Sequence, residues 1–345
     1  MLRITDMKLT GFLLISTCLL LGSEVGPKPA ITPGSRVLMD AHNCYPYGGR
    51  WADRIERALK TGPPLAIEQD LFWYPDPHTH HSQSFVTHGK PIQGNEPTMR
   101  TYFFERIRPL MEKALQEGNH GDWPLITLNL DFKSDEPAHH AAVWKLLKEY
   151  ELWICSAERA SDIRNVMPMT VRPLLVLTGE ADSQERDFYD VVPVGDELLV
   201  FGAVHTRGKN PMSPAEILVS EPSNNYRRWW NNPWSVVERG GQRKAGSWTE
   251  HDNMRLRELV THAHELGLWI RFYTLDGVPD HDLRANGWDK GYNFGSKYRA
   301  SIRWSAAINA GADFLATDQY EDVAVMLKVN GTPGRAVFAA PDATK

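Results

Sequence analysis

The sequence predicts a single-domain α/β protein, a (β/α)8 TIM-type barrel over residues 33–330. Short apolar runs alternate with segments of helical periodicity, which is the pattern of a parallel sheet covered by helices. About eight such units within about 300 residues match the usual size of this barrel. No Ser/Gly-rich linker divides the 345 residues, and 42% hydrophobic with 23% charged residues indicate one packed core.

The predicted strands are short apolar runs, and several of them end in a polar residue that an α/β barrel would place at its functional face. Bounding Gly, Pro and polar residues set their limits. The predicted strands cover residues 36–39, 65–73, 124–131, 173–178, 198–204, 226–230, 268–274 and 314–317.

The predicted helices lie between these strands, where apolar residues recur at helical spacing. The first is closed by Thr61-Gly62-Pro63, the second ends at Gly118, and the third begins at Pro137, a residue that suits a first helical turn. The helices cover residues 51–60, 99–117, 137–150, 250–266, 297–309 and 321–327. Residues 331–345 form a predicted C-terminal tail.

Two segments depart from this alternation. A stretch rich in Pro and His follows the second strand and is predicted to return through residues 84–88 as a hairpin-like insertion, with the histidines of 78–81 at its solvated tip. Residues 223–246 are rich in Asn, Trp and Gly and are predicted to form a long loop around the short sixth strand. Its tryptophans either contact a head group or lipid or pack in the core. His139 and His140 are expected at the surface.

The N-terminus has the features of an export signal. Lys8 precedes an apolar run at residues 11–22, which is too short to span a bilayer and suits a signal peptide. Small residues at 22 and 23 allow cleavage, so residues 1–24 are predicted to be a signal peptide and the protein to be secreted or periplasmic. Cys44 and Cys155 would remain, either bridged or as two free thiols.

Polar side chains stand where the first three strands end, and these ends meet at one face of a parallel barrel. His42 and Asn43 follow the first strand. Glu68 and Asp70 share one face of the second strand because side chains alternate along it. Asp131 closes the third strand. Asn43, Glu68, Asp70 and Asp131 offer only oxygen ligands, which predicts one hard divalent cation, Ca²⁺ or Mg²⁺.

Histidines and cations complete this candidate site. His88 ends the returning strand of the insertion, and two histidines can exchange protons near neutral pH. His42 and His88 are therefore the predicted catalytic acid and base. Lys133 and Arg271 are predicted to offset the charge of a substrate phosphate, although each also fits a salt bridge within the barrel.

These motifs resemble the phospholipase C-like phosphodiesterase superfamily, which includes phosphatidylinositol-specific phospholipases C and glycerophosphodiester phosphodiesterases. The similar segments are His42-Asn43-x-Tyr45, Glu68-x-Asp70-x-x-Trp73 and Thr87-His88-Gly89. In the calcium-dependent phospholipases the Asn and three acids bind Ca²⁺, and the resemblance implies this role for Asn43, Glu68, Asp70 and Asp131.

The branch of the superfamily is not fixed by these motifs. The third-strand acid is usually Glu, whereas Asp131-x-Lys133 resembles the Mg²⁺-dependent sphingomyelinase D branch. Residues 269–274 and 311–318 resemble the last two strands of glycerophosphodiester phosphodiesterases, whose usual His-Arg-Gly is His42-Asn43-Cys44 here.

Together with the predicted signal peptide, the resemblance implies an exported, metal-dependent phosphodiesterase. It would cleave a phosphatidylinositol-like phospholipid or its head-group diester, through a cyclic phosphate where a neighbouring hydroxyl attacks. A glycerophosphodiester phosphodiesterase and a non-catalytic barrel that binds lipid or sugar phosphates are the alternatives. An amidohydrolase would need His-x-His on the first strand. The net charge of −5 without a basic run disfavours nucleic acid as a partner. Peripheral membrane contact stays open, and no protein partner is implied.

Overall fold

The computed structural model describes residues 31–46, 51–75, 82–118, 123–283 and 290–330. They belong to one compact unit that begins at Ile31. The predicted signal peptide, the predicted tail and the histidines of 78–81 lie outside the described residues. Among the helices that are described, none combines the length and apolarity that a bilayer span requires.

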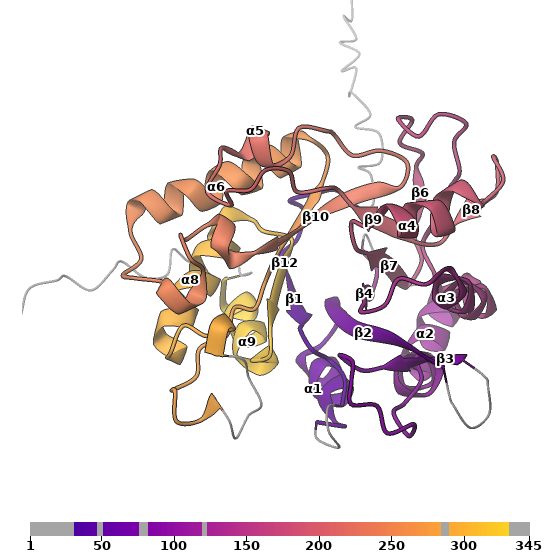
Figure 1. The fold of residues 1–345 in the computed structure, drawn as a ribbon, viewed down its shortest axis with the longest axis horizontal. Coiled ribbons are helices and arrows are strands. Elements are labelled where there is room, and N and C mark those ends of the chain that lie inside the picture. The colour runs from indigo at the N-terminus through magenta and orange to yellow at the C-terminus, as the bar shows by residue number, and fades with distance from the viewer. Residues whose placement is uncertain (1–30, 47–50, 76–81, 119–122, 284–289, 331–345) are drawn as a thin grey trace, which may run out of the picture. The chain divides into compact units, whose positions relative to one another are not determined.

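Eight parallel strands close into a barrel, as the sequence predicts (Figure 1). The strand order is β1-β12-β11-β10-β9-β7-β4-β2, and pairing of β1 with β2 completes the circle. The strands are β1 (Leu38–Ala41), β2 (Leu65–Pro75), β4 (Ile126–Phe132), β7 (Leu174–Thr178), β9 (Phe201–Ala203), β10 (Arg227–Pro233), β11 (Trp269–Tyr273) and β12 (Phe314–Thr317).

Helices surround the barrel, and their ends follow the signals in the sequence. The helix α6 begins with a capping box between Thr249 and Asp252, and the helix α8 ends at Gly311, whose φ of 80° suits glycine. The α-helices are α1 (Arg54–Thr61), α2 (Glu105–Glu117), α3 (Pro137–Glu149), α4 (Asp182–Glu185), α5 (Ala215–Leu218), α6 (Glu250–Glu265), α8 (Lys297–Ala310) and α9 (Tyr320–Asn330).

Several short helices join these elements. The predicted helix at 99–117 is two pieces, because its first turns form the π-helix η1 (Arg100–Phe104) before α2. A second π-helix is η3 (Arg186–Asp190). The 3-10 helices are η2 (Glu151–Trp153), η4 (Trp234–Val236), η5 (Gln242–Lys244) and η6 (Lys290–Tyr292).

Additional strands extend the barrel. The predicted hairpin-like insertion is confirmed, because β3 (Ser82–Val86) pairs antiparallel with the outer half of β2. A small antiparallel sheet was not predicted. It consists of β5 (Ser156–Glu158), β6 (Met169–Thr170) and β8 (Glu197–Leu198), which are too short to give a periodic signal.

The packing corrects two expectations from the sequence. His139 and His140 are fully buried rather than at the surface, since their rings pack against Phe132. Hydrogen bonds engage both ring nitrogens of His139 and Nδ1 of His140. The segment 223–246 is not mainly a loop, because β10 supplies a complete barrel strand and η4 and η5 follow it. Its tryptophans 229, 230 and 234 are buried in the core. Cys44 and Cys155 are both buried and free.

Candidate active site

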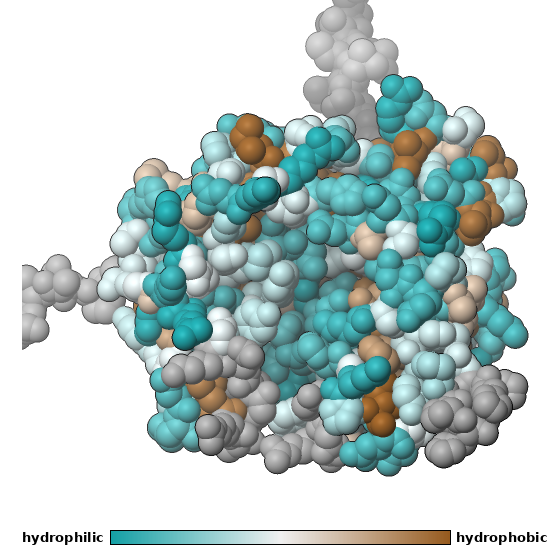
Figure 2. Space-filling view, viewed as in Figure 1, coloured by the Kyte–Doolittle hydropathy of each residue, from teal (hydrophilic) through white to brown (hydrophobic). Residues whose placement is uncertain are grey.

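A cavity of about 640 Å³ opens where the barrel strands end, at the face that carries function in such barrels. Figure 2 shows this hollowed face lined by hydrophilic residues. The site residues predicted from the sequence line it together, apart from Asp70, which is fully buried beneath it. They are His42, Asn43, Glu68, His88, Asp131, Lys133 and Arg271. Their catalytic, phosphate and metal roles stay predictions.

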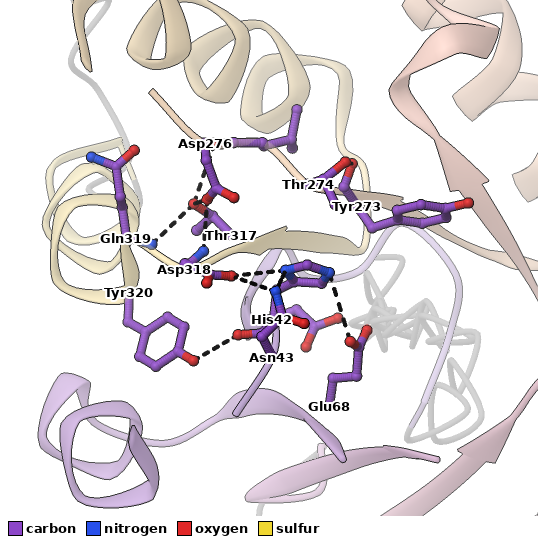
Figure 3. A network of polar contacts seen from close by, with 12 residues as sticks. His42, Asn43, Glu68, Tyr273, Thr274, Asp276, Thr317, Asp318, Gln319 and Tyr320 are labelled. Carbon is purple, nitrogen blue, oxygen red and sulfur yellow. Dashed lines mark hydrogen bonds and ion pairs between the residues drawn. The ribbon is translucent and has the colours of Figure 1, made fainter. Parts of the chain in front are cut away.

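His42 directly follows β1 and lines the cavity. Its ring lies between two carboxylates (Figure 3). Its Nδ1 lies 2.8 Å from Oδ1 of Asp318, and its Nε2 lies 3.7 Å from Oε1 of Glu68. Burial by itself lowers the pKa of His42, but the neighbouring carboxylates outweigh burial and raise that pKa to about 9. In the protein without a bound cation, His42 is therefore an imidazolium at neutral pH.

Asp318 is a site residue for which the sequence predicted no role. Ala41 and Thr317 are register partners in β1 and β12, so the residues that follow them, His42 and Asp318, face each other. The second carboxylate oxygen of Asp318 accepts a hydrogen bond from Nη2 of Arg54 at 3.0 Å. Burial raises the pKa of Asp318, but His42 and Arg54 hold it below its ordinary value. The strand-end rule that identified His42 could have identified Asp318 as well.

Asp276 supports this pair from the loop after β11. Its Oδ1 accepts hydrogen bonds from the hydroxyl of Thr317 and from the backbone N–H of Asp318, each at 2.7 Å (Figure 3). Burial and the neighbouring charge of Asp318 raise the pKa of Asp276 to about 7. The chain reaches this position through Thr274, whose φ of 62° is strained for a β-branched residue, and Gln242 of η5 holds that turn by hydrogen bonds.

Glu68, Asp70 and Asp131 form an acidic group in which one oxygen of each lies within 4.8 Å of the others. The strand register explains the grouping, because Asp70 of β2 is the partner of Asp131 of β4 and Glu68 lies two residues earlier on the same face. Burial, followed by the charges of Glu68 and Asp131, raises the pKa of Asp70 well above its ordinary value. Sequence alternation predicted the pair on β2 and the strand-end rule predicted Asp131, and the register shows why the three acids lie together.

Lys133 contacts two of these acids. Its Nζ lies 2.7 Å from Oδ2 of Asp131 and 3.2 Å from Oδ2 of Asp70. Burial lowers the pKa of Lys133, but the two carboxylates outweigh it and raise that pKa above the ordinary value. The ammonium is thus charged and contacts carboxylates, although its side chain also lines the cavity.

Arg271 of β11 forms a salt bridge within the barrel, which was the alternative to its predicted role at a substrate phosphate. Its Nε pairs with Asp40 of β1, and its Nη2 pairs with Glu68. Its Nη1 donates to Oδ1 of Asn231, the register partner on β10, at 3.0 Å. Burial raises the pKa of Glu68, but Arg271 and His42 lower it to about 2. Arg271 therefore neutralises buried carboxylates, and among them Asp40 had no predicted role.

His88 lies two residues beyond β3, lines the same cavity and is exposed. Partial burial and the positive charge of Lys133 lower its pKa, so His88 is a neutral imidazole at neutral pH. The two predicted catalytic histidines thus differ in protonation, as an acid and a base must.

The acidic group fits a hard cation. Among the described residues, neither carboxylate oxygen of the buried Asp70 accepts a hydrogen bond, and the ammonium of Lys133 lies 3.2 Å from its Oδ2. A buried carboxylate with so few partners is costly, and a bound divalent cation would compensate it further. Asn43 lines the same cavity, but its amide is engaged elsewhere. Its Oδ1 accepts from the hydroxyl of Tyr45 at 2.8 Å, and its Nδ2 donates to Asp318 at 3.1 Å. The Oδ1 atom of Asn43 keeps a second lone pair with which it could bind a cation.

Comparisons with known proteins leave the family open. No family model and no curated protein matches this sequence. A solved glycerophosphodiester phosphodiesterase from Parabacteroides distasonis is 14% identical over 86% of this chain and 99% of its own, with a TM-score of 0.46. Wild-type HPPK-DHPS from Plasmodium falciparum is 9% identical over 90% of this chain and 49% of its own, with a TM-score of 0.42. Likenesses this distant carry no functional argument.

Proposed function

We propose that this protein is an exported phosphoric diester hydrolase that uses two histidines and a hard divalent cation. The observation that carries the proposal is the meeting of His42, His88 and the acidic group at one polar cavity. The three parts come from different strands, and each part is what cleavage of a phosphodiester requires: an acid, a base and a means of neutralising phosphate charge.

The histidines transfer protons. One accepts the proton of the attacking hydroxyl, either a neighbouring hydroxyl of the substrate or water, and the other protonates the leaving oxygen. Asp318 accepts the Nδ1–H of His42, which fixes the ring and directs Nε2 toward the cavity and Glu68. Where the substrate hydroxyl attacks, the first product is a cyclic phosphate.

The cation would be held by Glu68, Asp70 and Asp131, with Asn43 as the fourth ligand implied by the family resemblance. When bound there, it supplies positive charge to the phosphoryl oxygens. Lys133 could add a hydrogen bond to the same phosphate, because its side chain lines the cavity and is partly exposed.

The substrate is a phospholipid such as phosphatidylinositol or its deacylated head-group diester. The polar lining of the cavity favours the second candidate, a glycerophosphodiester phosphodiesterase, because charged and hydroxyl-bearing side chains suit a water-soluble diester. Trp51, Tyr273 and Tyr292 also line the cavity and offer flat faces to a sugar or inositol ring.

Phosphorus NMR of the purified protein tests the proposal. Phosphatidylinositol, glycerophosphoinositol and lysophosphatidylcholine are each incubated with Ca²⁺, with Mg²⁺ and with EDTA. We expect loss of a diester resonance, appearance of a monoester or cyclic phosphate, and suppression by EDTA. Unchanged spectra for all three substrates with both metals would overturn the proposal in favour of a binding barrel.

A further inference from the structure

We propose that Lys133 is a resident counter-ion that occupies the proposed cation site and must leave the carboxylates for a divalent cation to bind. The inference rests on the cation site of the proposed function. It assigns to Lys133 a control over metal affinity, in addition to any contact with the substrate.

The charge of the site supports a resident cation. Two basic side chains, Arg271 and Lys133, face four carboxylates of β1, β2 and β4: Asp40, Glu68, Asp70 and Asp131. Without Lys133, Arg271 and the His42 imidazolium would still offset the charge of Asp40 and Glu68, but Asp70 would lose the cation that contacts it. An unpaired buried carboxylate is strongly destabilising, so Lys133 holds the site together in the absence of metal.

The two basic residues differ in their freedom to move. The side chain of Arg271 is 3% exposed, and all three of its nitrogens are bonded to Asp40, Glu68 and Asn231. The side chain of Lys133 is 23% exposed, and that of its partner Asp131 is 43% exposed. Lys133 therefore has an open path from the carboxylates into the cavity, whereas Arg271 is fixed.

Occupation by the ammonium and by a metal ion is mutually exclusive at the oxygen they share. Nζ of Lys133 lies 3.2 Å from Oδ2 of Asp70 and 2.7 Å from Oδ2 of Asp131, within the group that would bind the metal. A cation on those oxygens would repel the ammonium at a few ångströms. Displaced toward the cavity, the ammonium would face an incoming phosphate, so metal binding would also deliver Lys133 to the substrate.

Isothermal titration calorimetry with Ca²⁺ and with Mg²⁺ tests the inference without any substrate. Lys133→Met removes the competing charge, and we expect it to bind at least one of the two metals at least tenfold more tightly than the wild type. Lys133→Arg keeps the charge and is expected to bind no more tightly than the wild type. Lys148→Met is the matched control, because Lys148 pairs with Glu151 on the surface, away from the cavity.

Thermal unfolding supplies a second measurement. In EDTA, Lys133→Met is expected to melt below the wild type, and saturating metal is expected to raise its melting temperature more than that of the wild type. Wild-type metal affinity in a folded Lys133→Met protein would overturn the inference. If neither protein binds metal, the inference fails with the cation site, whereas diester cleavage in EDTA would show that the phosphodiesterase function stands without it.

Discussion

Two buried arginines have different charged surroundings, one at the barrel mouth, where the cavity opens, and one in the barrel wall, on the outer helix α8. Arg303 of α8 is 1% exposed and forms two hydrogen bonds with one carboxylate, that of Glu238, at 2.9 and 2.7 Å. The rings of Trp248 and Phe294 lie 5.4 and 4.9 Å from its guanidinium. Arg271 at the mouth is 2% exposed but spans two carboxylates, with two further acids close by.

The difference separates a structural pair from a functional group. In the wall, one positive charge meets one negative charge, and backbone carbonyls take the remaining donors of Arg303. At the mouth, carboxylates outnumber cations and the oxygens of Asp70 lack donors. Such an excess of buried negative charge lowers the stability of the fold. Its presence at a cleft therefore indicates a functional site.

The largest expected effect is at the mouth. His42→Ala removes one of the two proton-transfer groups, so turnover of the diester should fall by about a thousandfold or more. The fold should persist, because the ring stands at the edge of the cavity rather than in the core. Turnover is measured by the phosphorus NMR assay, and circular dichroism checks the fold.

A surface histidine provides the control for this change. Nε2 of His205 lies 2.9 Å from Asp182, so it forms a similar His–Asp pair, but it does not line the cavity. His205→Ala should keep wild-type turnover. Normal turnover by folded His42→Ala would remove His42 from the proposed mechanism.

The next effect is expected in the wall. Arg303→Met leaves Glu238 buried without its cation, so the free energy of unfolding should fall by about 4 kcal/mol. Turnover per folded molecule should stay unchanged, because the partners of this pair among the described residues do not line the cavity. Urea unfolding measures the first quantity. The double variant Arg303→Met/Glu238→Leu should recover part of the loss, and failure to do so would mean that the pair is not the cause.

A smaller effect is expected from pH at the buried His139. Burial lowers its pKa to about 4, below the ordinary 6.5, although a hydrogen bond to the Ser134 backbone acts in the opposite direction. The unfolded chain therefore binds more protons between these values, and His139 makes stability fall as pH drops from about 6.5 to 4. The full contribution is up to about 3 kcal/mol. Urea unfolding of the wild type and of His139→Gln from pH 7 to 4 should show a shallower decline in the variant. Parallel curves would contradict the assignment.

The sequence predicts most of the fold because the barrel rests on local patterns. Apolar runs and helix-end residues mark the strands and helices in order, and the strand-end rule brings His42, Glu68 and Asp131 to one face. The strand β10 was only partly recognised, because its Trp, Asn and Pro residues are typical of loops as well as of buried strands. Burial of His139 was missed, since its partners Ser84 and Phe132 lie on other elements.

Partners within the site could not be predicted, because they depend on register and closure. Asp40 and Arg271 are separated by 231 positions, and nothing local links them. The partners of Asn43 depend in the same way on Asp318, which follows the last strand. Residue types at strand ends can be found in the sequence, whereas which side chains neutralise one another requires the closed barrel.

Closure between β1 and β12 has a consequence for how the protein matures. His42 follows the first strand and Asp318 the last, 276 positions away, and β1 lies between β12 and β2 in the sheet. A chain still emerging during synthesis cannot form this pair until nearly all of the barrel has been made. Such long-range contacts form late in folding because the entropy of loop closure must be overcome first. The proposed activity would therefore arise only once the barrel closes, so a partly folded chain would be inert.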